Sequence, residues 1–581
     1  MESQPPSSPA PAAAFAGGTR LTAFFLLTIF VALCITSVEQ ESATFDETHY
    51  LGSGRYLLTA HRWDMPDSLL HPVFWTVWHD LPLLGVSGPD SVWSNPNGIA
   101  RGQGIMALRS DDALLTACRF MSLPFAIGLG VVMFCWARQL YGDAGGIAAL
   151  FFFAFSPNLL AHAGLVTPDV ALSCFVILTL WRLWALAKAP SIRNLLFAGG
   201  ALGLMLLTKY TAVLLVPIFF VTDCAYRSAV GQFRWRTPSS FWRALNHWPA
   251  LLALAALLVW VAYGFHVGRL ALPAGLSLRL PAAPYFQGLL FQYAQSKSPH
   301  SFFLMGMYSP RGWWYYFLVV ALIKIPVGTL LLLAGLVVGR RWLGIRWQAD
   351  ELYLLLPFVL MFAYLSGCNT IQNGFRYLLP VYPLSLIWLG NYGACLRRGN
   401  NGIRAGVGLL AAWTLAATLL AWPGYLAYFN ELIGGPRNGY HWLSDSNVDW
   451  GQDLKALKKF MVRHDIGRIG LSYFGTADPA HYGIAYDYLP SANSGLRAAL
   501  PSPDEHSRFL ALSVYQYQAI DFADRDVYRF FYGQTPNGMA GNSILIFDLK
   551  NLTPRRRAPM PLRVREFFGL ATNNAPADSC P

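Results

Sequence analysis

Long stretches of apolar residues with few charges constrain this chain more than any other feature. Of its 581 residues, 54% are hydrophobic and 13% are charged. A membrane-spanning helix needs about 20 consecutive apolar residues. This composition excludes a disordered chain, a disulfide scaffold and an ordinary cytosolic enzyme. The apolar runs predict a polytopic α-helical membrane protein with about eleven spans, near residues 21–38, 114–136, 144–160, 168–187, 193–207, 210–224, 248–266, 314–338, 352–366, 374–396 and 405–422.

The distribution of Lys and Arg predicts the orientation of these spans. With a cytoplasmic amino end, fourteen basic residues fall in the inside loops, whereas the short outside connections hold only Lys209 and Arg376. Basic residues concentrate in cytoplasmic loops. The chain has 43 basic and 31 acidic residues, and the inside loops hold much of this basic excess. No nucleic-acid partner is needed to explain the positive net charge.

The orientation divides the chain into three parts. Residues 1–19, rich in Pro, Ala and Ser, are predicted to be a disordered cytoplasmic N-terminus, and residues 20–423 a transmembrane domain. Two long loops of that domain, 39–113 and 267–313, are placed outside. Residues 424–581 are predicted to form a small extracytoplasmic α/β domain, with a helix at 452–463 and apolar runs at 469–474, 509–514 and 543–547.

Two adjacent carboxylates, Asp46 and Glu47, follow the first predicted span and stand beside His49. Carboxylates at a membrane surface can supply a general base and an acceptor for a substrate hydroxyl group. The pattern Thr44-x-x-Glu47 also matches a capping box, so the same residues could instead begin an interfacial helix. Both roles remain open from spacing alone.

Three cations map to the outer half of the membrane: Lys209, Lys324 and Arg376. Lys324 lies well inside a predicted span, where a lipid-facing cation is costly, so it is expected to face a cavity or an acidic partner. Lys209 is either a snorkelling turn residue or an anion ligand. Lys and Arg donate charge-assisted hydrogen bonds to phosphoryl oxygens, so together these cations favour a lipid-linked phosphate or pyrophosphate.

Two further acidic features have simpler interpretations. Asp169 begins a predicted span, where a carboxylate complements the helix dipole, so capping is its expected role. The segment 445–453 alternates Asp and Asn, but its glycine and its twelfth position do not fit a calcium loop. We expect it to cap the 452–463 helix, and no metal site or cofactor is predicted.

The residues carry a family resemblance. Asp46-Glu47-Thr48-His49, with His71-Pro72 downstream, resembles the Asp-Glu-x-His and His-Pro-Pro signatures of the protein O-mannosyltransferase and aminoarabinose transferase group, which are integral-membrane glycosyltransferases of the GT-C type. His71-Pro-Val departs from His-Pro-Pro. Later segments look like further landmarks of bacterial members: Thr167–Asp169, Leu207–Tyr210, Gly312–Tyr316, Lys324–Pro326 and Arg376–Pro380.

The resemblance implies an inverting transfer of a sugar from a polyprenyl-phosphate donor to a protein Ser or Thr, a lipid or a glycan. The reaction would take place on the outer face of a bacterial inner membrane. Asp46 would act as the base and Glu47 would orient a substrate. The other residues implied to bind substrate are His49, His71, Asp169, Lys209, Tyr210, Lys324, Arg376 and Tyr377. The alternatives are a transporter or flippase of lipid-linked sugars and a non-catalytic scaffold.

Overall fold

A computed structural model describes residues 17–551 except 61–62, 64–68, 234–237, 273–275, 299, 370, 399–400, 490, 492–506 and 523–524. Most of the predicted N-terminal segment, and the end of the chain from 552 onward, therefore lie outside the described residues.

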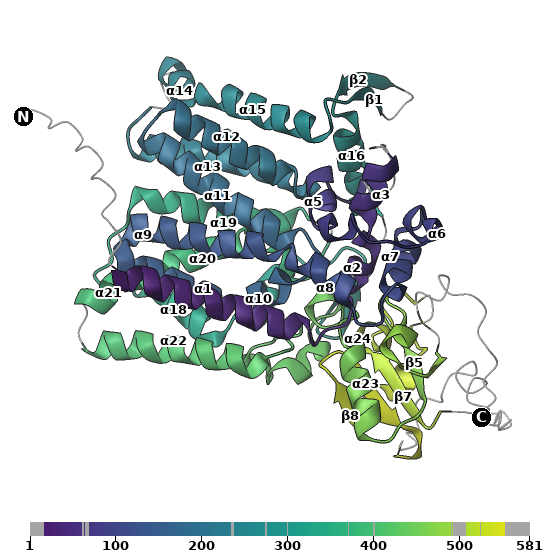
Figure 1. Cartoon of the computed structure of the whole chain (residues 1–581). Helices are drawn as coiled ribbons and strands as arrows, with labels where there is room; N and C mark the ends of the chain where they lie inside the picture. Colours follow the sequence, from purple (N-terminus) through teal and green to yellow (C-terminus); the bar gives the residue numbers. More distant parts are fainter. Residues whose placement is uncertain are drawn as a thin grey trace, which may run out of the picture.

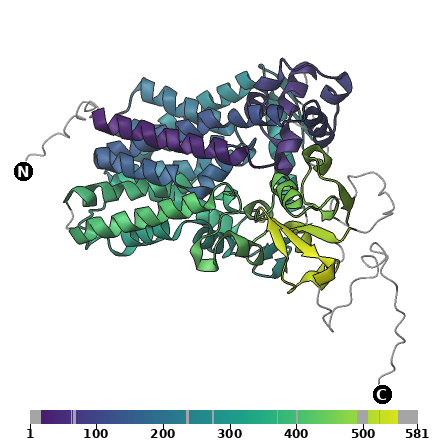
Figure 2. The ribbon, with the colours of Figure 1, turned by 60° about the horizontal axis from the view of Figure 1, so that its bottom comes forward.

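A bundle of long helices forms most of the molecule, and its members lie side by side (Figures 1 and 2). The bundle buries a continuous apolar core. Its helices are α1 (Gly17–Val38), α9 (Leu123–Ala154), α10 (Pro157–Ala163), α11 (Asp169–Lys188), α12 (Ile192–Leu206), α13 (Leu215–Ala229), α14 (Pro238–Leu245), α15 (His247–Ala262), α17 (Tyr316–Lys324), α18 (Val327–Val338), α19 (Leu352–Gly367), α20 (Tyr382–Trp388), α21 (Tyr392–Arg398) and α22 (Asn401–Ala421).

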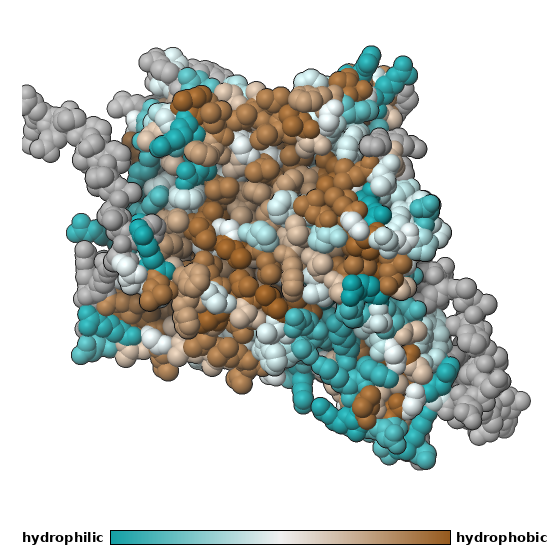
Figure 3. All heavy atoms as spheres, in the orientation of Figure 1, coloured by the Kyte–Doolittle hydropathy of each residue, from teal (hydrophilic) through white to brown (hydrophobic). Residues whose placement is uncertain are grey.

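Six helical stretches among the described residues are long and apolar enough to cross a membrane, and the bent pair α17 and α18 would make seven. The helices α12 and α15 are apolar but shorter. On the face seen in Figure 3, hydrophobic side chains cover the middle of the bundle, whereas hydrophilic ones gather toward its ends. The protein is therefore a polytopic helical membrane protein, but the predicted number of eleven spans is not confirmed.

Two predicted spans are broken. The span predicted at 314–338 divides into α17 and α18, which are bent by 116°. The break lies at Ile325, whose extended backbone is what a following proline imposes. The span predicted at 374–396 consists of the 3₁₀ turn η5 (Phe375–Tyr377), α20, a second 3₁₀ turn and α21.

One end of the bundle, here called the capped end, carries short helices and hairpins (Figure 1). They come from the two long loops predicted from the sequence, except α8, which lies at the start of the span predicted at 114–136. These elements are α2 (Phe45–Tyr50), α3 (Ser53–Ala60), α5 (Val73–Trp78), α6 (Asp90–Trp93), α7 (Gly98–Ala107), α8 (Ala113–Phe120), α16 (Ala283–Lys297), and the antiparallel pairs β1 (Val267–Ala271) with β2 (Ser277–Pro281) and β3 (Phe302–Leu304) with β4 (Met307–Ser309).

A five-stranded sheet completes the capped end, in the order β6-β5-β7-β9-β8. Strand β5 is parallel to β6 and β7, and β9 is antiparallel to β7 and β8. Three of the strands coincide with the predicted apolar runs. The elements are α23 (Leu454–Arg463), β5 (Ile469–Ser472), β6 (Tyr486–Tyr488), β7 (Phe509–Ser513), α24 (Val514–Tyr517), β8 (Gly538–Ala540) and β9 (Ile544–Asp548).

Candidate active site

An ion pair between Asp46 and Arg376 forms the centre of the candidate site. Arg376 Nη1 donates to Asp46 Oδ2 at 2.9 Å, and the two side chains are 14% and 22% exposed for Arg376 and Asp46 respectively. The Tyr50 hydroxyl, one helical turn further along α2, donates to the same carboxylate oxygen at 3.3 Å. The Asp46 carboxylate is therefore held from two sides yet remains partly accessible.

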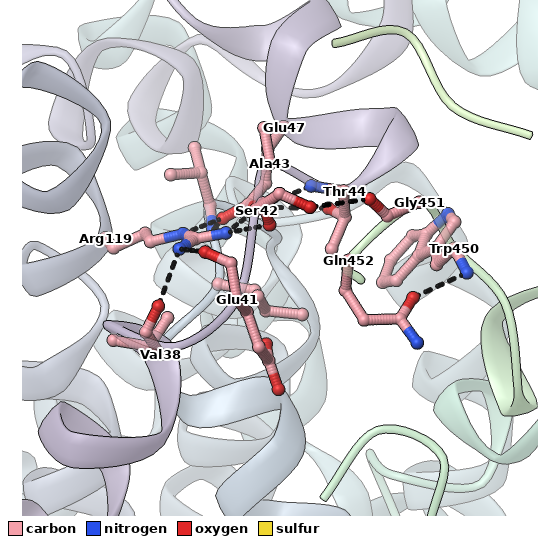
Figure 4. A network of polar contacts seen from close by, with 12 residues as sticks. Val38, Glu41, Ser42, Ala43, Thr44, Glu47, Arg119, Trp450, Gly451 and Gln452 are labelled. Carbon is pink, nitrogen blue, oxygen red and sulfur yellow. Dashed lines mark hydrogen bonds and ion pairs between the residues drawn. The ribbon is translucent and has the colours of Figure 1, made fainter. Parts of the chain in front are cut away.

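Contacts with the segment before α23 hold the residues that precede Asp46, and Figure 4 shows Ser42 beside Gly451 and Gln452. The N–H of Phe45 donates to Trp450 O at 2.7 Å, and the N–H of Ser42 donates to Gln452 O at 2.8 Å. The Ser42 hydroxyl donates to Gly451 O at 2.9 Å. Residues 42–45 are thus fixed to residues 450–452, which follow them by about 400 positions in the chain.

Asn447 holds the loop that carries Arg376. Its side-chain oxygen accepts the Phe375 N–H at 3.1 Å. Gly374 has a φ of +96°, and a Cβ at this position would lie 2.7 Å from the Asn447 amide. Only glycine permits both this conformation and this close approach.

Glu47 lies beside Asp46 in sequence but faces a different environment. Arg119 donates to its two oxygens at 2.8 and 2.7 Å, and Val166 N–H donates at 3.0 Å. The predicted capping box is present, since the Thr44 N–H donates to Glu47 at 2.9 Å. Burial raises the pKa of Glu47, but Arg119 and the N–H donors outweigh it, so the pKa is lowered.

Arg119 shares its remaining donors with the chain just after α1. It donates to Val38 O at 2.9 Å, Glu41 O at 3.1 Å and Ser42 O at 2.8 Å (Figure 4). The Glu47–Arg119 pair is fully buried and satisfied, which favours a role in positioning the Asp46 segment over contact with substrate. Sequence reasoning missed Arg119, although a charge inside the apolar run 114–136 was a signal for it.

A second ion pair joins Lys209 to Asp169. Lys209 Nζ lies 2.7 Å from Asp169 Oδ1, and Lys209 is 17% exposed whereas Asp169 is 1% exposed. The other oxygen of Asp169 is buried without a hydrogen-bond partner in the described part of the chain. Lys209 Nζ also lies 5.6 Å from the ring centre of Tyr377, and the Arg376 guanidinium lies 5.8 Å from it. Tyr377 therefore stands close to both cations.

Lys324 is buried away from any carboxylate that the structure describes. Its Nζ donates to Leu426 O and Asn447 O, both at 2.8 Å, and lies 4.6 Å from the Phe429 ring centre. The expectation of a cavity or an acidic partner at Lys324 is therefore not met. Since Asn447 also holds the Arg376 loop, Lys324 contacts the framework of the site rather than its accessible face.

Of the two predicted histidines, His49 belongs to α2 and His71 lies next to it. Both ring nitrogens of His71 are buried without a partner among the described residues, and its ring meets that of Tyr50 edge-on at 4.8 Å. Burial and the nearby Lys209 hold the pKa of His71 well below its usual value. Beside it lies a cavity of about 10 Å³, room for about one water molecule. His49 packs against Gly98 of α7.

Tyr210 does not join these residues. Its hydroxyl lies 3.4 Å from that of Tyr263, and its ring packs 5.4 Å from Tyr285. These tyrosines belong to a separate apolar cluster at the capped end. The structure therefore places the predicted substrate ligand Tyr210 in a packed tyrosine cluster.

Two aromatic residues of the site escaped sequence reasoning. The Arg376 guanidinium stacks over Trp450 at 4.6 Å from the ring centre, and His162 of α10 lies 6.1 Å from the same ring. His162 Nδ1 is buried without a partner among the residues described. A histidine within an apolar run was the available signal.

The segment 445–453 neither caps α23 nor gathers metal ligands. The Asp453 side chain makes no capping bond, but accepts from Asn542 N–H at 3.0 Å and Ser543 N–H at 3.1 Å. The predicted cap is therefore wrong, because this carboxylate ties α23 to the β8–β9 turn. Within the described ranges, no group of three or more His, Cys, Asp or Glu could hold a metal ion.

Together the residues define an integral-membrane protein with a partly accessible carboxylate and neighbouring cations at one end of its bundle. Residues 103–263 match the model of the family described as dolichyl-phosphate-mannose-protein mannosyltransferase, which confirms the predicted glycosyltransferase resemblance over that segment. The match covers less than half of the chain. No protein of curated function matches it.

Two solved structures are similar to the chain at low identity. ArnT from Cupriavidus metallidurans, bound to undecaprenyl phosphate, is 13% identical with a TM-score of 0.48, over 93% of this chain and 100% of that chain. The oligosaccharyltransferase AglB from Archaeoglobus fulgidus, in complex with an inhibitory peptide and a dolichol-phosphate, is 13% identical with a TM-score of 0.41, over 68% of this chain and 55% of that chain.

Proposed function

We propose that this protein transfers a sugar from a polyprenyl-phosphate donor to a hydroxyl group of a protein, lipid or glycan acceptor, with inversion at the anomeric carbon. The observation that carries the proposal is the Asp46–Arg376 pair, with the Lys209–Asp169 pair beside it. The matched family is named for a sugar donor carried on a lipid phosphate.

Asp46 is the general base in this proposal. Its carboxylate accepts the proton of the acceptor hydroxyl, and the acceptor oxygen forms a bond to the anomeric carbon. The bond from that carbon to the phosphate oxygen breaks, and the polyprenyl phosphate leaves with the electron pair. General-base catalysis of this kind contributes about 10²- to 10⁴-fold to a rate.

Arg376 and Lys209 stabilise the leaving phosphate. Arg376 Nε is buried without a partner in the described part of the chain, so this donor is not committed to Asp46. Lys209 is partly exposed, and both it and Arg376 lie close to the Tyr377 ring centre, at 5.6 and 5.8 Å. Cations aimed at the position where negative charge develops lower the barrier to transfer.

The protein would act at the outer face of a bacterial inner membrane, with residues 424–551 outside. The positive-inside distribution of Lys and Arg supports this orientation. Protease protection of a C-terminal tag in sealed right-side-out vesicles tests it: cleavage is expected without detergent, and cleavage only after solubilisation contradicts it.

Transfer is tested with the purified protein in liposomes, a panel of polyprenyl-phosphate sugars and acceptors fractionated from membranes. We expect product from wild type and a loss of about 100-fold or more in D46N. The matched control is D90N, because Asp90 is an exposed acid in the same outer loop. Full transfer by folded D46N would refute the role of Asp46. Movement of the lipid across the bilayer without product would favour the flippase alternative.

A further inference from the structure

A second polar cavity lies between the hairpin β3–β4, the loop before η5 and the segments around Asp445 and Asp521. Its volume is about 70 Å³, room for several water molecules. Asp445 and Asp46 both interact electrostatically with Arg376. The cavity is therefore linked to the candidate site through Asp445, which lines it and interacts with Arg376.

Two carboxylates stand in the wall of this cavity. The Tyr515 hydroxyl donates to one oxygen of Asp521 at 2.5 Å, and Asp445 accepts the N–H of Ser446. Burial raises the pKa of Asp445 to about 6, although Arg376 opposes the rise. The carboxylates retain accepting capacity beyond these contacts, since each ionised carboxylate offers about four lone-pair sites.

Ser444 supplies an independent sign of a missing partner. It lines the cavity and is 5% exposed, and its hydroxyl has no hydrogen-bond partner among the described residues. A buried hydroxyl without a partner is energetically unfavourable. A bound polar group would remove that cost.

The charge of the lining selects the kind of ligand. The described residues that line the cavity include no Lys or Arg, so a phosphate would meet carboxylates without a lining cation. The aromatic rings of Phe302 and Tyr515 add apolar surface beside the acceptors. Several hydrogen-bond acceptors next to aromatic faces suit a ligand with many hydroxyl groups and an apolar ring face.

We propose that this cavity binds carbohydrate hydroxyl groups of the acceptor, with Asp445 and Asp521 accepting their hydrogen bonds and Ser444 completing the set. This inference rests on the transfer function proposed above. It implies that the acceptor is itself a glycan or a glycan-bearing molecule, and that the donor phosphate binds elsewhere, at Lys209 and Arg376.

The test is binding of a panel of methyl glycosides to the full-length protein in detergent, measured by saturation-transfer NMR with inorganic phosphate as the comparison ligand. We expect one or more glycosides to bind, with a dissociation constant that rises about tenfold in D521N and in S444A. The matched control D526N replaces an exposed acid near Asp521 and should bind as wild type. Undecaprenyl phosphate should bind equally to all four proteins.

S444A also separates binding from folding. Because the buried Ser444 hydroxyl has no described partner, its removal should not lower the melting temperature. Absence of glycoside binding to wild type, unchanged binding by D521N and S444A, or binding of phosphate in their place would overturn the inference. If glycosides bind here but no polyprenyl-phosphate sugar is turned over, the transfer function fails and so does the assignment of this cavity to its acceptor, whereas the carbohydrate site stands.

Discussion

Arg376 donates to Asp46 at 2.9 Å although 330 residues separate them in the chain. Asp46 belongs to the first loop of the capped end, and Arg376 to the turn η5 that precedes α20. The pair brings the proposed base and the proposed phosphate-binding cation to one point, which neither segment could provide alone. Four predictions follow from this pair and from the contacts around it.

Replacing Arg376 by lysine should abolish most activity although the charge is kept. Arginine can hold Asp46 through one nitrogen and offer Nε to a phosphate, whereas lysine has a single ammonium group. We expect R376K to lower kcat about 100-fold in the liposome transfer assay. R311K, which changes an exposed arginine at the capped end, is the control and should retain activity. Activity of R376K within a few fold of wild type would show that the reaction does not require the several donors of the guanidinium group.

Lys209 and Lys324 should respond differently to loss of charge. K209Q should weaken binding of undecaprenyl phosphate about tenfold or more, because it removes a charge-assisted donor. K324M should leave this affinity within about twofold, since Lys324 binds two carbonyl oxygens and not the accessible site. K324M should instead lower the melting temperature, as two buried carbonyl groups lose their donor. The affinity of both variants for undecaprenyl phosphate and their thermal unfolding test this difference. A large loss of affinity in K324M would contradict it.

The buried pair Glu47–Arg119 should matter for stability. Removal of one partner leaves an uncompensated buried charge, which costs about 3–5 kcal/mol. E47Q should therefore lower the melting temperature clearly, and E47Q/R119Q should cost less than the sum of the two single variants. The exposed pair Arg109–Asp111 provides the control, since D111N should not change the melting temperature. Equal effects of E47Q and D111N would contradict the assigned role.

Asp449 should make stability fall as pH rises. Burial raises its pKa to about 7, whereas an aspartate in an unfolded chain titrates near 4. The folded state therefore binds the proton more tightly, so the free energy of unfolding gained from Asp449 is complete below about pH 4 and is lost as pH rises through about 7.

The variant D449N isolates this effect. Its amide oxygen can still accept the Tyr515 N–H, which Asp449 accepts at 2.9 Å. D449N should gain stability relative to wild type as pH rises from 5 to 8, by about 1 kcal/mol or more. Unfolding followed by tryptophan fluorescence at both pH values measures this, and a stability difference that does not depend on pH would refute it.

Much of the helical bundle could be predicted because its apolar runs are long and carry few charges, unlike those of helices in soluble proteins. The interruption at Lys209 was visible as a charge between two apolar runs, and α12 and η2 (Tyr210–Leu214) meet there. The bend at Ile325 was not predicted, because a proline within an apolar run is compatible with a continuous buried helix. Pro326 favours the extended backbone of Ile325, but the packing that accommodates the 116° bend is not visible in a linear sequence.

The sequence identified residues of the candidate site but not which of them contact one another. Asp46 and Glu47 are adjacent on α2, where successive side chains point about 100° apart. One therefore faces Arg376 and the other Arg119, and their spacing could not assign these partners. Lys324 was expected to face a cavity or an acidic partner. A cation inside an apolar run is visible in the sequence, but the carbonyl oxygens that accept its hydrogen bonds are not.

The contacts between residues 42–45 and 450–452 also bear on how the protein matures. During synthesis, Asp46 leaves the ribosome long before Gly451, to which Ser42 is bonded across 409 positions. In a nascent chain already inserted in the membrane, Asp46 would lack the contacts with residues 450–452 that hold its segment. Transfer by Asp46 would therefore begin only after residues 450–452 have been made and have folded against residues 42–45.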